Sequence, residues 1–89
     1  MKYLRQEMLD QGYDEDTIES VEKIFRRYGA PGLHEFFKRL LNSEVRHVRQ
    51  YCQGPPHYLE AMEKAIEISV QELATAAFLD LHLEAGDVN

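Results

Sequence analysis

The chain of 89 residues contains one cysteine, three prolines and no tryptophan. A single cysteine, Cys52, excludes an intramolecular disulfide and any cysteine-based zinc site, and such sparse use of cysteine is typical of a reducing compartment. No segment approaches the roughly 18 uninterrupted apolar residues of a membrane span. The first residues, MKYLRQEMLD, are charged and lack the apolar run of a signal peptide. We therefore expect a cytoplasmic protein.

Motifs for catalysis, cofactors and metals are also missing. The glycines occur singly or in the turn at 29–32, so none forms a phosphate-binding loop, and no serine lies in a nucleophile-elbow motif. No histidine has a second histidine three or four residues away, and the helical pair Glu44 and His47 lacks the second copy that a di-metal bundle needs. We expect a protein that is not an enzyme and that holds no cofactor or metal.

Charges of opposite sign are unevenly distributed within the net charge of −6. Residues 1–22 carry two Lys/Arg against seven Asp/Glu, residues 23–49 seven against two, and residues 58–89 one against seven. A basic middle can pair with its acidic neighbours or present a separate face to a partner. With 44% apolar and 29% charged residues, the composition is that of one globular domain over residues 1–89. Dimerisation is a common way for so small a domain to bury more apolar surface.

The longest uninterrupted segment covers residues 56–86, and it predicts one helix of roughly 45 Å. Two adjacent apolar lines run along this helix. The first holds Leu59, Met62, Ile66, Val70, Leu73, Ala77 and Leu81, and the second holds Ala61, Ala65, Ile68, Ala76, Leu79 and Leu83. Together they cover roughly 220° of the circumference, so we expect the helix to contact protein on two sides. Glu72 lies within this arc, and we expect it to pair with a Lys or Arg of another helix.

The preceding region, residues 1–54, predicts shorter helices. Residues 2–11 form an amphipathic helix that stops at Gly12, and residues 15–28 form a second helix. Asp14 is the expected N-cap of this second helix, with Tyr13 packed on Ile18 as a hydrophobic staple. The segment Gly29-Ala30-Pro31-Gly32 predicts a break. Residues 33–53 form one helix or two, and we favour a break with Ser43 as the cap. The expected fold is an all-α bundle of four or five helices.

Without catalytic motifs, protein–protein interaction is the function that the sequence favours. We expect the long helix to form a homodimer or partner interface and the acidic helix faces to occupy a basic cleft on a protein of the nucleic-acid machinery. The protein would then be an inhibitor or adaptor, in character like the small acidic helical effectors of phages and plasmids. The interface residues are Leu73, Ala77, Phe78, Leu81 and Leu83. The acidic faces comprise Glu60, Glu63 and Glu67 and a second row of Asp14, Glu15, Asp16, Glu19 and Glu22.

The alternative is a nucleic-acid-binding regulator. If residues 33–53 form one helix, four cations fall within about 100° of arc and could contact phosphates. These cations are Lys38, Arg39, Arg46 and Arg49. The net charge of −6 opposes this reading, because dedicated nucleic-acid binders are usually basic overall. The sequence leaves open whether the four cations are exposed or paired within the chain.

Overall fold

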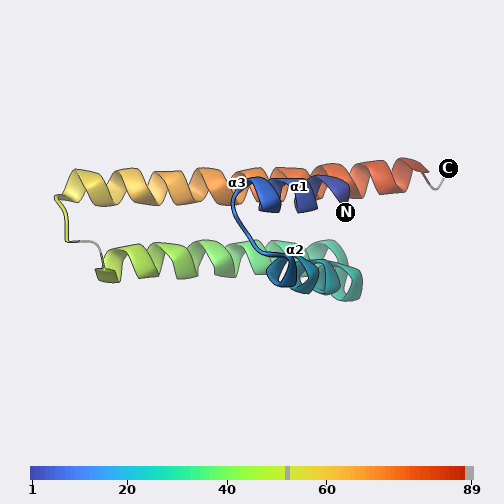
Figure 1. Cartoon of the computed structure of the whole chain (residues 1–89), viewed down its shortest axis with the longest axis horizontal. Coiled ribbons are helices and arrows are strands. Elements are labelled where there is room, and N and C mark those ends of the chain that lie inside the picture. Colours follow the sequence, from blue (N-terminus) through green and yellow to red (C-terminus); the bar gives the residue numbers. More distant parts are fainter. Residues whose placement is uncertain (52, 88–89) are drawn as a thin grey trace.

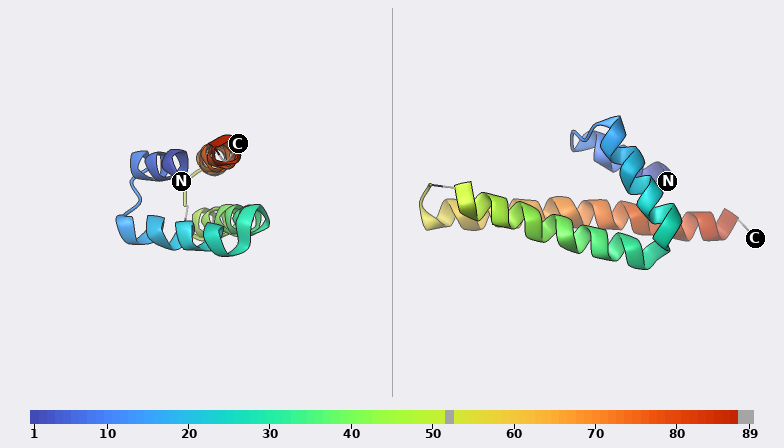
Figure 2. Two further views of the ribbon diagram at one scale, coloured as in Figure 1. Left: turned by 90° about the vertical axis from the view of Figure 1, so that its right-hand side faces the viewer. Right: turned by 90° about the horizontal axis from the view of Figure 1, so that it is seen from below.

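The computed structural model describes residues 1–51 and 53–87, with the side chains of these residues up to His82. The described residues are all-α: they form the helices α1 (Lys2–Asp10), α2 (Glu15–Tyr51) and α3 (Pro56–Asp87), and no strand. The second half of α2 and α3 form a long antiparallel hairpin (Figure 1). The helix α1 and the first half of α2 lie against one side of this hairpin, over only part of its length (Figure 2). The molecule is therefore elongated, with extents of 53 × 22 × 19 Å.

The predicted long C-terminal helix is confirmed as α3. Its first apolar line supplies the centre of the core, where Val70, Leu73 and Ala77 are buried. Its second line is covered only in part: Ala76 is buried, but Ile68 and Leu79 are 49% and 46% exposed. The chain itself therefore covers one apolar side of α3 and leaves much of the other open.

The turn between α1 and α2 follows the sequence prediction closely. Gly12 adopts a φ of +92°, which a residue with a side chain rarely adopts, and it stops α1. The backbone N–H of Tyr13 donates to Met8 O and that of Gly12 to Leu9 O, both at 3.0 Å, which is the Schellman pattern. The side chain of Tyr13 packs against the core. Burial, and next the charge of Glu44, raise the pKa of the Tyr13 phenol.

The N-terminus of α1 is held by an acidic side chain of α3. Asp80 is only 3% exposed, and its two carboxylate oxygens accept hydrogen bonds from the backbone N–H groups of Tyr3 and Leu4, each at 2.8 Å. The first N–H groups of a helix have no partner within the helix, so an acceptor at this position acts as a cap even when it comes from elsewhere in the fold. Asp80 therefore fixes where α1 sits along α3.

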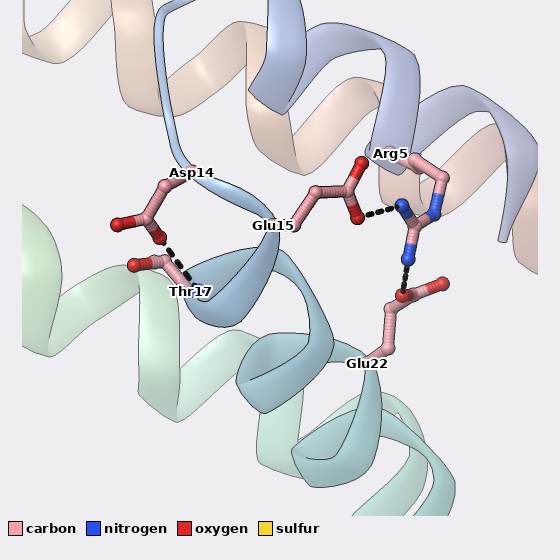
Figure 3. Close-up of polar contacts among 5 residues, drawn as sticks. All are labelled: Arg5, Asp14, Glu15, Thr17 and Glu22. Carbon is pink, nitrogen blue, oxygen red and sulfur yellow. Dashed lines mark hydrogen bonds and ion pairs between the residues drawn. The ribbon is translucent and has the colours of Figure 1, made fainter.

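A second polar contact ties α1 to α2. The Arg5 guanidinium donates to Glu15 and Glu22, each at 2.5 Å, and Figure 3 shows it reaching from α1 to both carboxylates of α2. Glu22 is only 6% exposed, so Arg5 provides the counter-charge that its burial requires. The hydrogen bonds to the two carboxylates raise the pKa of Arg5 above its ordinary value. This contact joins α1 to the first half of α2.

The prediction of four or five helices is wrong, because α2 runs from Glu15 to Tyr51 as one element with a kink. The expected break at 29–32 appears as this kink, since Gly29 leaves helical geometry at φ 68° and ψ −156°. The break that we favoured at Ser43 does not occur: Ser43 is exposed and helical. Its hydroxyl can be satisfied by water there, so a stop would lose backbone hydrogen bonds and gain nothing. Cys52 lies outside the described residues.

Candidate partner-binding surface

The five residues predicted for an interface do not share one environment. Leu73 and Ala77 are each 1% exposed, because the chain's own helices cover them. Leu73 is therefore closed to a partner in this structure, whereas Ala77 contributes to the floor of the groove described next. Phe78 is 62% exposed, and Leu81, about one turn further along α3, is half-buried, so these two remain accessible. The side chain of Leu83 lies outside the part that the structure describes.

An apolar groove lies beside Phe78, between the kinked region of α2 and the C-terminal half of α3. Its volume is about 290 Å³, and small or apolar side chains supply most of its lining. The lining residues are Ala30, Leu33, His34, Phe37, Ala74, Ala77, Phe78 and Leu81. The ring of Phe78 contacts that of His82 on the next turn, with ring centroids 4.7 Å apart. We refer to these lining residues as the Phe78 groove.

The first acidic row lies on the same side of α3 as the Phe78 groove. Glu60, Glu67 and Phe78 are separated by 7 and 11 residues, close to two and three full helical turns. Glu63, between the two glutamates, accepts a hydrogen bond of 2.6 Å from Arg49 of α2, and this contact raises the pKa of Arg49. Glu60 and Glu67 are exposed. This side of α3 therefore changes from acidic to apolar along its length.

The second acidic row lies at the start of α2, in the region shown in Figure 3. Asp14 is the N-cap that the sequence predicted, since its carboxylate accepts the Thr17 backbone N–H at 2.8 Å. Hydrogen bonds from the Thr17 side chain, and then from its backbone, lower the pKa of Asp14. Glu15 and Glu22 are bound to Arg5, whereas Asp16 and Glu19 are exposed. Most of this row therefore has a structural role within the chain.

The four predicted cations divide into two pairs. Arg39 Nε donates to Glu35 at 3.2 Å on the same helix, and Arg49 is bound to Glu63 of α3. Lys38 and Arg46 are exposed, and the structure gives neither of them an ion pair within the described residues. Arg46 lines a shallow groove together with the acidic Glu67. The basic middle is thus partly neutralised by the chain itself.

Two carboxylates lie in the apolar arc of α3, and the sequence predicted the role of neither correctly. Glu72, which we expected to pair with a cation, is exposed, and no Lys or Arg of the described residues pairs with it. Asp80 was not singled out from the sequence, although it is the buried one. His34, which lines the Phe78 groove, was also missed, because a lone histidine on a helix gives no signal of its own.

Comparison with models of known protein families, with curated proteins and with solved structures finds no match to this chain. Within the described residues, none of the helices has both the length and the apolar character that crossing a membrane requires. In the same part of the chain, no three His, Cys, Asp or Glu side chains gather where they could hold a metal ion.

Proposed function

We propose that this chain is a non-catalytic protein-binding module whose partner places an apolar side chain in the Phe78 groove. The observation that carries the proposal is the aromatic ring of Phe78, 62% exposed at an apolar groove. Aromatic side chains beside a desolvated pocket are typical anchors of protein interfaces. A groove between two helices also suits the apolar face of a partner helix.

The acidic row specifies the charge of the partner. Glu67 lies about 16 Å along the α3 axis from Phe78, at 1.5 Å per residue, and Glu60 lies two turns further on. A partner helix with one apolar anchor and basic side chains about three and five turns away would match both ends of this surface. Opposite charges at the rim of an interface mainly increase the association rate and the specificity. We therefore propose a partner with a basic surface, such as a protein that handles nucleic acid, which this chain would inhibit or recruit.

The alternative, direct binding of nucleic acid by the basic face, is less well supported. Arg39 and Arg49 are held by carboxylates, so phosphate contacts would have to replace two ion pairs. Of the four predicted cations, only Lys38 and Arg46 lack an ion pair within the described residues, and two cations are too few for the strong, salt-dependent affinity that many phosphate contacts give.

Affinity capture from a lysate of the source organism tests the proposal when the bait is varied. We expect a protein that stays bound after nuclease treatment, is lost with Phe78→Ser and is weakened by salt. The double variant Glu60→Gln, Glu67→Gln should weaken capture without abolishing it, because it removes only rim charge. Tyr28→Ser is the matched control, since Tyr28 is an aromatic residue 58% exposed that lies outside the groove.

Two results would contradict the proposal. Capture that is equally strong with Phe78→Ser would show that the groove is not the binding surface. Recovery of nucleic acid that depends on Lys38 and Arg46, with every co-purified protein lost on nuclease digestion, would favour the basic face instead.

A further inference from the structure

The row of α3 side chains against which α1 packs continues along α3 beyond the end of α1. Asp80 binds the N-terminus of α1, and Gln11 Nε2 at its other end donates to Ser69 O at 3.0 Å. The helix α1 therefore covers α3 from residue 80 back to Ser69. By the helical period the same line then passes through Ala65, Met62 and Tyr58. These three are exposed, Met62 at 43% and Tyr58 at 59%.

On the adjacent side of α2, the residues beyond Glu44 are exposed as well. Glu44 and Ala65 line one groove with Tyr13 of the α1–α2 turn, and this groove marks where the cover provided by α1 stops. His47 and Tyr51 follow Glu44 at helical spacing, with ring centroids 4.7 Å apart, and Tyr51 is 63% exposed. Together, the exposed residues of the two helices on this side form what we call the open hairpin face: His47 and Tyr51 of α2, and Tyr58, Met62 and Ala65 of α3. In Figures 1 and 2 this end of the hairpin lies beyond α1 and the first half of α2.

The open hairpin face carries no Asp, Glu, Lys or Arg. The same stretches of α2 and α3 are rich in charge, but the helical period places those residues on the other sides of the two helices. They are Arg46, Arg49, Glu60, Glu63, Lys64 and Glu67. Depletion of charge with enrichment of tyrosine and methionine is the composition of an interface core. Glu44 borders the face only at its inner edge.

The surface area of the whole chain is large enough for an interface with a second copy. A compact monomer of 10.4 kDa should expose about 5,400 Å², whereas this chain exposes 6598 Å². The excess of about 1,200 Å² exceeds the roughly 600–1,000 Å² that each partner buries in a standard interface. A second copy would use the same uncharged face on both sides, as two-fold interfaces require.

We propose that the open hairpin face binds the same face of a second copy, so that two hairpin ends form an antiparallel four-helix arrangement. On this side of the hairpin, α1 and the first half of α2 already cover the half away from the α2–α3 loop. The hairpin of the second copy therefore packs on the uncovered half, with its own α2–α3 loop pointing towards the α1–α2 turn. The two-fold axis then crosses the middle of the uncovered length of α3, residues 56–68. Met62 is the central residue of this length, and it lies opposite Met62 of the second copy. This dimer does not depend on the Phe78 groove, which lies on another side of α3.

Sedimentation of the full chain across concentrations of about 1–500 µM tests the dimer. We expect the average mass to rise from 10.4 kDa towards twice that value within this range. Met62→Glu and Met62→Lys should each remain monomeric, because either change places two like charges opposite one another. An equimolar mixture of the two variants should recover the dimer mass.

Leu79→Glu is the matched control, because Leu79 is an apolar residue of α3 that is 46% exposed but lies off the open hairpin face. It should dimerise as the wild type does, and circular dichroism should show the same helicity for all four chains. A wild type that stays monomeric throughout the range, or a Met62→Glu variant that still dimerises, would overturn the inference. Loss of partner capture with Phe78→Ser, by contrast, would leave the dimer mass unchanged, so the two proposals can fail separately.

Discussion

Replacement of Asp80 by alanine should detach α1 from the rest of the fold. Asp80 is 3% exposed and accepts two backbone hydrogen bonds of 2.8 Å from the first turn of α1. A helix of nine residues is too short to be stable alone in water, so α1 depends on this contact and on its packing. The variant removes both acceptors and leaves the N–H of Leu4, a fully buried residue, without a partner.

The size of the effect follows from the two donors. An unsatisfied buried donor costs about 1–3 kcal/mol, with the Leu4 N–H at the upper end and the partly buried Tyr3 N–H at the lower end. Alanine is the better helix former, which offsets about 0.6 kcal/mol. We expect Asp80→Ala to lower the free energy of unfolding by roughly 3 kcal/mol, or the melting temperature by about 12–24 °C. Asp80→Asn keeps one acceptor oxygen and should cost about half as much.

Thermal and urea denaturation followed by far-ultraviolet circular dichroism would measure this loss. Glu60→Ala is the control, because it removes an exposed carboxylate from the same helix and should change stability by less than about 0.5 kcal/mol. Hydrogen exchange should show the α1 amides losing protection before those of the hairpin. If Asp80→Ala came within 1 kcal/mol of the wild type, or if α1 and the hairpin lost protection together, the cap would not be what holds α1.

Three further predictions concern other contacts. Arg5→Met should lower the melting temperature more than Glu15→Gln does, because it leaves the buried Glu22 without its counter-charge; equal losses in thermal melts would contradict this. Gly29→Ala should cost about 1–3 kcal/mol in urea denaturation, because φ 68° with ψ −156° is accessible almost only to glycine, and an unchanged midpoint would show that the kink can relax. Tyr13 should ionise above the ordinary pKa of a tyrosine in an ultraviolet titration, and Tyr13→Phe should remove that late component. Since the folded state raises this pKa, the contribution of Tyr13 to stability is complete below pH 10 and should be lost as the pH rises through the raised pKa.

The parts of the fold that depend on local chemistry could be predicted from the sequence. Gly12 followed by Tyr13 and Asp14 specifies a helix stop, a staple and a cap within three residues; the stop and the cap were found in place, and Tyr13 packs against the core. Residues 56–86 predicted α3 because no helix breaker interrupts them. In both cases the information lies within one or two helical turns, so no knowledge of the tertiary arrangement was needed.

The features that depend on how the three helices pack on one another could not be predicted from the sequence. Ser43 is a good cap residue, but the apolar period of α2 continues through it and packs on α3, and tertiary packing outweighs a local capping preference. Leu73 and Ala77 were assigned to an external interface because the apolar arc of α3 is too wide for one neighbour. The sequence did not indicate that α1 would take part of that arc. Asp80 was overlooked for the same reason, since a carboxylate among apolar residues has a role only once the N-terminus of α1 lies against it.

The apolar arc of α3 is too wide to be covered by one helix, so different parts of it must pack against different helices. The second half of α2 covers one side over most of its length, and α1 covers the adjoining line from residue 80 to Ser69, where the chain turns away at Gly12. From Ala65 to Tyr58 the same line is exposed, although its side chains are of the kind found in interfaces. Because α1 cannot extend past Gly12, the chain cannot cover this length with the same helix. A hairpin from a second copy has the length and the uncharged surface to do so, and this is why the proposed dimer and the intramolecular docking of α1 rest on one line of side chains.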